Sequence, residues 1–158
     1  MYLRDSKKDD VVDLRYIPVH VAYATYKMLM KLSDEQDMGL LQEKCLEKIL
    51  DFMRWDNLYP KIEDKLGYMI FSIIKNHCFV DGNKRISLAL AAFFLKINGL
   101  DYLTIKFIRE MENIIYETAR GNIDRKLLIR CISSIIEERD DEVLKIEILK
   151  ILNNSQKD

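Results

Sequence analysis

Residues 77–95 read HCFVDGNKRISLALAAFFL, and they join a short polar run directly to a strongly apolar one. The apolar run, residues 86–95, is hydrophobic almost all the way round a helix and carries the small residues Ala89, Ala91 and Ala92. A helix with this pattern is normally surrounded by other elements. The stretch therefore predicts a buried central helix that is entered through a polar loop.

The segment before this loop is also expected to be helical. From about Lys61 the apolar residues advance by three or four positions, which places them on one face of a helix. That face carries Leu66, Ile70, Ile73 and Ile74, followed by His77. The polar run is therefore a connection between two helices, and His77 is expected at the end of a buried face.

The rest of the chain follows the same helical spacing. Five Gly and two Pro leave few turn signals, so an all-α fold is expected. Gly99 is expected to end the central helix in the left-handed conformation. The remaining predicted helices are one over residues 18–32, one with Leu41, Cys45, Ile49, Phe52 and Met53 on one face, one from a Thr104 cap to Gly121, one capped by Asp124, and one over residues 142–152.

The length of the chain, 158 residues, suits a single domain with a substantial core. We expect this domain to span residues 18–139. Residues 1–17 are expected to be a loose N-terminal segment, and residues 140–158 a C-terminal helix with a disordered tail, NNSQKD.

Composition excludes several classes of function. A net charge of -1 gives no bulk attraction to nucleic acid or to an anionic membrane, and no basic recognition helix is visible. No apolar stretch is long enough to span a bilayer and the N-terminal run MYLRDSKKDD lacks the apolar core of a signal peptide, so a cytoplasmic protein is expected. The three cysteines, Cys45, Cys78 and Cys131, match neither a disulfide framework nor a zinc site and are expected to be reduced thiols.

The polar loop has the composition of a phosphate site. The first turn of the central helix offers backbone N–H groups without intrahelical partners, and the helix dipole adds positive potential there. Gly82 would let a phosphate approach the backbone, the Asn83 amide can donate a hydrogen bond, and Lys84 and Arg85 supply positive charge. These residues together predict a polyphosphate cradle.

Two neighbouring side chains add chemistry to this cradle. Asp81 is a hard oxygen ligand suited to a Mg²⁺ ion that bridges phosphates. His77 can take up a proton near neutral pH, which suits a general base that acts on a hydroxyl nucleophile. The site therefore points to chemistry at a phosphorus atom.

Each residue also has a simpler explanation when it is considered alone. His77 could cap a helix or complete a core, Asp81 could cap the central helix, and Lys84 could be a solvated charge. Phe79 suits a hydrophobic anchor for the loop, and DGNK is a common turn. The run is neither a P-loop nor a calcium-binding loop, because it lacks their glycine and acid spacing.

Residues 77–85, HCFVDGNKR, resemble the signature of the Fic/Doc (Fido) family, which is His-x-Phe-x-Asp/Glu-Gly-Asn-Gly/Lys-Arg. IIKNH (73–77), FFLKING (93–99) and ARGNI (119–123) are also similar to this family. The resemblance covers about residues 41–138, and the first forty residues do not clearly contribute. It implies a compact all-helical Fic/Doc fold around a buried central helix.

The resemblance also implies an activity. Fic/Doc proteins transfer AMP, or in some members phosphate, from a nucleoside triphosphate such as ATP to a Ser, Thr or Tyr hydroxyl of a target protein. The chain would then be a protein adenylyltransferase (a nucleotidyltransferase that performs AMPylation) or a Doc-like protein kinase.

Site roles carry over by motif position. The resemblance assigns the catalytic base to His77, the loop anchor to Phe79 and the Mg²⁺ ligand to Asp81. It assigns the anion hole to Gly82 and Asn83, and the binding of the neighbouring phosphates to Arg85. The loop RWDNLYP (54–60) falls where the family has its target-contacting flap, which makes Trp55 and Tyr59 candidate contacts, although a loop that merely covers the core would look the same.

The sequence departs from the family pattern at three positions. Cys78 replaces a frequent Pro, Lys84 replaces a second Gly, and Leu88 replaces a second Arg. The last two departures are similar to the Doc branch, in which the member acts as a kinase. AMP transfer and phosphate transfer therefore both remain open.

Regulation and rival functions complete the expectations. Ser134 and Glu138 have the spacing of the family's inhibitory helix, but Arg139 follows where Gly or Asn is usual, and an ordinary helical pair is the simpler account. Without an internal inhibitor, a partner antitoxin is expected, as for a toxin of a toxin–antitoxin pair. The rival hypothesis is a catalytically silent Fido-fold module that binds a nucleotide or a partner.

Overall fold

The computed structural model describes residues 13–34 and 39–157, and within them the fold is all α-helical with no strands. None of the helices there is both long and apolar enough to cross a bilayer. The elements in order are α1 (Val19–Leu32), α2 (Cys45–Phe52), α3 (Ile62–Asn76), α4 (Asn83–Ile97), the short 3₁₀ turn η1 (Asp101–Leu103), α5 (Thr104–Arg120), α6 (Arg125–Ile136) and α7 (Glu142–Ser155).

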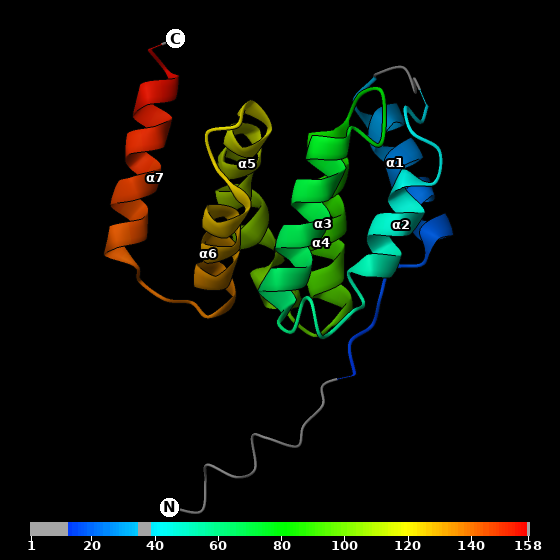
Figure 1. The fold of residues 1–158 in the computed structure, drawn as a ribbon, viewed down its shortest axis with the longest axis horizontal. Coiled ribbons are helices and arrows are strands. Elements are labelled where there is room, and N and C mark those ends of the chain that lie inside the picture. The colour runs from blue at the N-terminus through cyan, green and yellow to red at the C-terminus, as the bar shows by residue number, and fades with distance from the viewer. Residues whose placement is uncertain (1–12, 35–38, 158) are drawn as a thin grey trace, which may run out of the picture.

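Helix α4 is the central element, as its apolar run predicts. Figure 1 shows α3 and α4 in the middle of the molecule, with α1 and α2 on one side and α5, α6 and α7 on the other. Ile86, Leu90, Phe94 and Leu95 of α4 are buried in one continuous core. The helix begins at Asn83, three residues before the apolar run, so the basic end of the motif lies inside its first turn.

Helix α3 crosses α6 at very close range. Gly67 is buried in the middle of α3, and a Cβ atom built there would lie 2.4 Å from Cγ1 of Ile129. Contacts that short do not occur between real atoms, so only a hydrogen fits between the two helices. This contact fixes α3, the helix that leads into the polar loop.

The helix ends follow the sequence signals with one exception. Gly99 and Gly121 have φ angles of 80° and 87°, the left-handed values that end helices. Asp124 caps α6 by accepting a hydrogen bond from the Leu127 N–H at 2.8 Å. Thr104 is not an N-cap; it is the first residue of α5, and its hydroxyl donates to the Asp101 carbonyl of η1.

The expectation of three reduced thiols is wrong for two of the cysteines. Cys45, the first residue of α2, forms a disulfide with Cys78, which directly follows His77. Helix α2 begins at Cys45, so Leu41 lies outside it, in a segment that packs beside the loop. The pair is brought together by the tertiary fold, which the spacing of 33 residues in the sequence could not reveal.

Cys131 remains a free thiol in α6. Its burial in the core raises the pKa of the thiol to about 12, so the group stays protonated and inert near neutral pH.

Both ends of the described chain are more ordered than expected. Residues 1–12 of the predicted loose segment lie outside the described part, but the amide of Asn98 bonds both backbone groups of Arg15, at 2.8 and 2.9 Å. At the other end α7 runs through Asn153 and Asn154 to Ser155, so the expected disordered tail is helical there. The Ser155 hydroxyl donates to the buried Glu117 carboxylate at 2.6 Å, which fastens this end of α7 to α5.

Candidate functional site

The polar loop connects the C-terminal end of α3 to the N-terminal end of α4. His77 closes α3 with φ 48° and ψ 61°, a left-handed conformation that is uncommon for a non-glycine residue. This turn carries its side chain off the buried face of α3, and His77 is exposed. The expectation that His77 ends a buried stripe is therefore wrong, and its imidazole is accessible to a substrate.

Phe79 occupies the position of a loop anchor. Its side chain is buried and stacks on the ring of Tyr26 with 3.8 Å between centroids, while Tyr23 meets it edge-on. The Tyr26 hydroxyl donates a hydrogen bond to the Asp81 carbonyl at 3.0 Å. Helix α1 thus holds two points of the loop.

Tyr23 also links α1 to α2. Its hydroxyl donates to Glu47 at 2.9 Å. Burial, together with the hydrogen bond to that carboxylate, raises the pKa of Tyr23 to about 12. The hydroxyl therefore keeps its proton and the link persists throughout the neutral range.

Asn83 closes the loop with its own side chain. Its Oδ1 accepts from the Phe79 N–H at 3.0 Å, and its Nδ2 donates to the Phe79 carbonyl at 2.8 Å. This differs from the expectation that the amide points at an anion, because both of its polar atoms already bond the loop backbone. Asn83 shapes the site, and it can offer an anion its backbone N–H.

Gly82 is required by packing as well as by backbone conformation. Its φ is 85°, and a Cβ atom there would come within 2.9 Å of the Met30 sulfur in α1. Its N–H donates to Oδ1 of Asp81 at 2.7 Å. Because Gly82 has no side chain, the loop can pack against α1. The sequence had instead suggested that this glycine lets a phosphate approach the backbone.

The two basic residues of the motif lie on opposite sides of the first turn of α4. Arg85 reaches α1, where one guanidinium nitrogen donates to the Ser33 hydroxyl at 2.6 Å. Lys84 reaches α5, where its ammonium lies 5.3 Å from the ring centroid of Tyr116. The N–H groups of Asn83 and Lys84 have no partner within the helix, because they belong to its first turn. The helix end therefore combines free amide donors, a positive dipole and flanking cations.

Asp81 is the candidate metal ligand, and its side chain is exposed at the same end of α4. Across residues 13–34 and 39–157 no group of three or more His, Cys, Asp or Glu side chains could hold a metal ion. A lone carboxylate still fits Mg²⁺, which proteins often bind through one or two carboxylates with the remaining ligands supplied by substrate phosphates and water.

Residues 39–42 run beside the loop, a feature that sequence patterns did not reveal. The Leu41 N–H donates to the Cys78 carbonyl at 2.9 Å, and the Val80 N–H donates to the Gly39 carbonyl at 3.1 Å. Leu40 and Phe79 form an isolated antiparallel bridge. The disulfide between Cys45 and Cys78 supports the same contact, but the sequence did not reveal that these two cysteines are paired.

The aromatic loop 54–60 does not border this site. Tyr59 precedes α3 and His77 follows it, so the length of α3, about 22 Å, separates them. Figure 1 shows the connection from α2 to α3 at the opposite end of the bundle from the connection from α3 to α4. Trp55 stacks on Phe52 and Tyr59 stacks on Tyr68, which makes both rings part of a local surface cluster.

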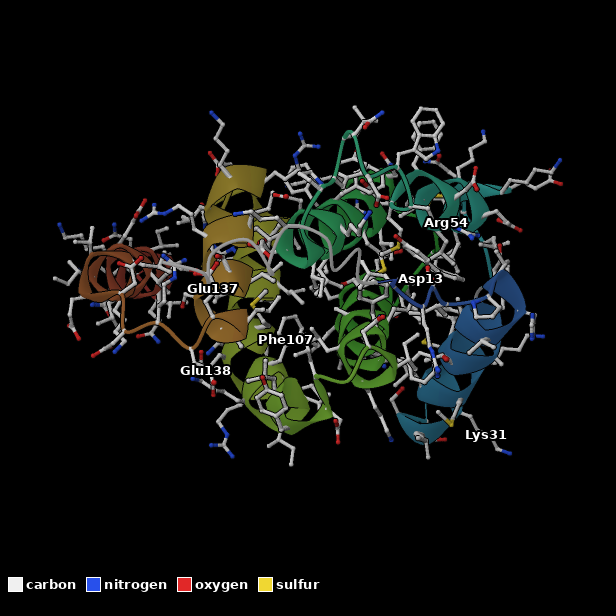
Figure 2. The ribbon with its side chains drawn as sticks, turned by 90° about the horizontal axis from the view of Figure 1, so that it is seen from below. Asp13, Lys31, Arg54, Phe107, Glu137 and Glu138 are labelled. Carbon is white, nitrogen blue, oxygen red and sulfur yellow. A yellow bond between two sulfur atoms is a disulfide. The ribbon has the colours of Figure 1, made fainter. Side chains whose placement is uncertain are left out.

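The inhibitory-helix spacing also falls elsewhere. Ser134 lies in α6, while Glu138 follows the helix with φ 50° and therefore is not its helical partner. Figure 2 shows Glu138 at the connection from α6 to α7. Because that connection is at the far end of α6 from the loop, the pair does not reach the candidate site.

The chain is similar to a known protein family and to a named relative. The model of the Fic/DOC family matches residues 16–95, which include α1 and the whole motif. A protein called Toxin Doc from Mycolicibacterium smegmatis is 36% identical over 66 residues, 42% of this chain and 51% of that protein. The chain thus spans about half the length of that relative. No solved structure matches.

The match corrects the expectation that the first forty residues do not clearly contribute. It begins at residue 16, and the geometry gives the reason: Tyr26 and Met30 of α1 and Ser33, the residue that follows it, lie against the motif.

Proposed function

This chain belongs to the Fic/DOC family, and we propose from that membership that it transfers AMP or phosphate from a nucleoside triphosphate to a hydroxyl side chain of a target protein. One observation carries the proposal. The exposed imidazole of His77 and the open first turn of α4 lie at the two ends of a single short loop, which is held in place by Phe79 and Asn83.

His77 would act as the general base. It would remove the proton from the target hydroxyl while that oxygen attacks phosphorus, and the bond from phosphorus to the leaving oxygen would break. Attack at the α-phosphorus releases pyrophosphate, and attack at the γ-phosphorus releases the nucleoside diphosphate. A positioned base contributes roughly 10²–10⁴-fold to such a reaction.

The first turn of α4 would hold the transferred phosphate. Backbone N–H groups at a helix N-terminus stabilise anionic oxygens without moving, which favours the charge that develops in the transition state. Lys84 and Arg85 flank this turn, each oriented by a contact to a neighbouring helix. Their charges would bind the phosphates that are not transferred.

Asp81 would hold a Mg²⁺ ion against the phosphates. When bound, the ion neutralises phosphate charge and helps to orient the leaving group. The carboxylate can do so because it is exposed and its Oδ1 is already oriented by the Gly82 N–H.

The family membership also suggests what the chain acts on and what inhibits it. The name of the M. smegmatis relative, Toxin Doc, supports a toxin role for this chain, with an antitoxin as its partner. Residues 39–42, which run beside the loop, are better placed than Trp55 and Tyr59 to meet a target chain near His77.

A labelling experiment tests the proposal. The protein, a His77→Ala variant and a His20→Ala variant are each incubated in a cell lysate with Mg²⁺ and ATP labelled at the α- or the γ-phosphorus. His20 is the matched control, because it is the other histidine of the chain and is exposed on α1. We expect a labelled protein band that disappears with His77→Ala and persists with His20→Ala.

The position of the label separates the two chemistries. Label from the α position identifies AMP transfer, and label from the γ position identifies phosphate transfer. If nucleotide binds, as measured by calorimetry, but neither label is transferred in a His77-dependent way, the transferase proposal is wrong and the chain is a binding module.

A further inference from the structure

A covalent bond holds the loop one residue away from the candidate base. Cys78 directly follows His77, and its disulfide partner Cys45 begins α2. The bond therefore ties α2 to the loop at the point where the backbone leaves the left-handed turn of His77. No other covalent link in the described chain joins the loop to a neighbouring element.

The two sulfur atoms differ in access. Cys78 is completely buried, whereas Cys45 is 7% exposed and lines a surface hollow of about 190 Å³. Lys48 and Asn76 are also part of the wall of this hollow. Glu43 lines it too, so the hollow carries one side chain of each charge. An attacking thiolate can approach Cys45 through this hollow, beside the Lys48 ammonium, which offsets the repulsion from Glu43.

The chemistry of the surroundings also favours a reversible reaction at Cys45. This residue lies in the first turn of α2, where the helix dipole stabilises a thiolate. Cys78, in contrast, is enclosed by the core, so it would leave as a thiolate and then take up a proton. The two cysteines therefore have distinct roles in exchange.

We propose that Cys45–Cys78 is a thiol–disulfide exchange site that takes a dithiol reductant and controls the order of the loop that carries His77. One thiolate of the dithiol attacks the Cys45 sulfur, the bond to Cys78 breaks, and Cys78 leaves with the electron pair and is protonated. The second thiol of the dithiol then attacks the mixed disulfide and releases Cys45. The protein gains two electrons and two protons, and the dithiol becomes a disulfide.

The structure indicates which part of the molecule would respond. After reduction the covalent tie between Cys45 and the loop is gone, while hydrogen bonds such as Leu41 to Cys78 and Gln42 to Asn76 remain. Helix α3 stays fixed by its contact with α6 at Gly67. The increase in motion should therefore concentrate in residues 39–45 and 76–80.

The first test does not depend on catalysis. The folded protein is treated with dithiothreitol, alkylated with iodoacetamide and digested for mass spectrometry. We expect the alkylation of Cys45 and Cys78 to require dithiothreitol, whereas any alkylation of Cys131, which is a free thiol, should be the same with and without it. Amide hydrogen exchange over residues 76–80 should accelerate about tenfold, with little change in α6.

Two variants serve as matched comparisons. Cys45→Ala should show fast exchange over residues 76–80 with or without dithiothreitol. Cys131→Ala should respond to dithiothreitol as the wild type does, because it removes a cysteine that takes no part in the disulfide. If Cys45 and Cys78 resist alkylation in the folded state, or become alkylated while exchange over 76–80 is unchanged, the exchange site is refuted.

The activity measurement rests on the proposed function. His77-dependent transfer should fall about tenfold on reduction, because a small misplacement of a catalytic group is costly, and it should recover on reoxidation. Transfer that is equal in the two redox forms would also overturn control of the site by this bond. If the loop loosens as expected but neither form transfers label, the exchange site stands and only the transferase proposal fails.

Discussion

Some of the motif residues hold the loop in place, and others face solvent. Phe79 is buried against Tyr26, both polar atoms of the Asn83 amide bond the backbone of Phe79, and Gly82 packs on Met30. His77 and Asp81, by contrast, are exposed. The nine-residue signature is therefore in good part a specification of loop structure.

Gly82 and Gly99 offer a matched test of this structural role. Both have a left-handed φ, 85° and 80°, but a Cβ at Gly82 meets Met30 whereas a Cβ at Gly99 meets nothing within 4 Å. Gly99→Ala should cost about 1 kcal/mol of unfolding free energy through backbone strain alone. Gly82→Ala should cost about 2–4 kcal/mol, because overpacking against α1 adds to the strain. Urea denaturation of the two variants measures the difference, and equal losses would contradict the packing role.

The sequence could predict such glycines but not their surroundings. Helix-ending positions such as Gly99 and Gly121 follow from local pattern, because the left-handed turn is set by neighbouring residues. The partners of Asn83 and Gly82 depend on the path of the loop and on α1, which lies about fifty residues away in the sequence. Local periodicity carries no information about contacts of that kind.

Among whole elements, α7 ends later than the sequence pattern predicts. It was expected to finish at residue 152, yet it extends to Ser155. The reason is a partner on another helix: Glu117 of α5 accepts hydrogen bonds from Asn122 at 2.7 Å and from Ser155 at 2.6 Å. The polar composition of the tail predicts disorder, because Glu117, which accepts its hydrogen bond, lies far away in the sequence.

The protonation state of Glu117 should control whether the C-terminal end of α7 stays attached to α5. Burial opposes ionisation, but the hydrogen bonds from Asn122 and Ser155 and the nearby Arg120 outweigh it and lower the pKa of the carboxyl. The stabilisation is therefore fully present above the ordinary glutamate pKa and is lost as the pH falls through the lowered value. Acidification should release the C-terminal end of α7 before the rest of the fold.

A substitution tests the same contact at neutral pH. Glu117→Gln replaces one acceptor oxygen with a donor, so one of the two hydrogen bonds is lost at a cost of about 1–3 kcal/mol. Hydrogen exchange in residues 150–157 should rise, whereas Glu112→Gln, an exposed residue of α5 that does not line the hollow beside α7, should leave it unchanged. Unchanged exchange in the Glu117 variant would show that this carboxylate does not hold the end of α7, and would leave the role to contacts such as that of Arg130 with Glu147.

The whole molecule is organised around α4, with the candidate site at one end. The central helix and the all-α class followed from the apolar run, because a helix that is hydrophobic on every side must be enclosed. The participation of α1 and residues 39–42 did not follow, since their contacts with the loop span long sequence distances. The disulfide was missed for the same reason.

That disulfide should contribute to global stability. It closes a loop with a sequence separation of 33 residues, which corresponds to about 3–4 kcal/mol in the chain-entropy treatment. Urea denaturation with and without dithiothreitol should show a loss of that size in the wild type and in Cys131→Ala. Cys45→Ala should be insensitive to the reductant, and sensitivity there would assign the effect to something other than this bond.

The close contact at Gly67 holds α3 in a fixed position against α6. Two helices separated by a single hydrogen cannot slide along one another without a collision between their atoms, so α3 and α6 behave as one rigid support. Movement beside the loop is therefore expected on the α1 side, away from this contact. If the proposed transfer reaction is correct, a directed-evolution library intended to change its target would do best to diversify α1 and residues 39–42 and to leave the contact between α3 and α6 unchanged.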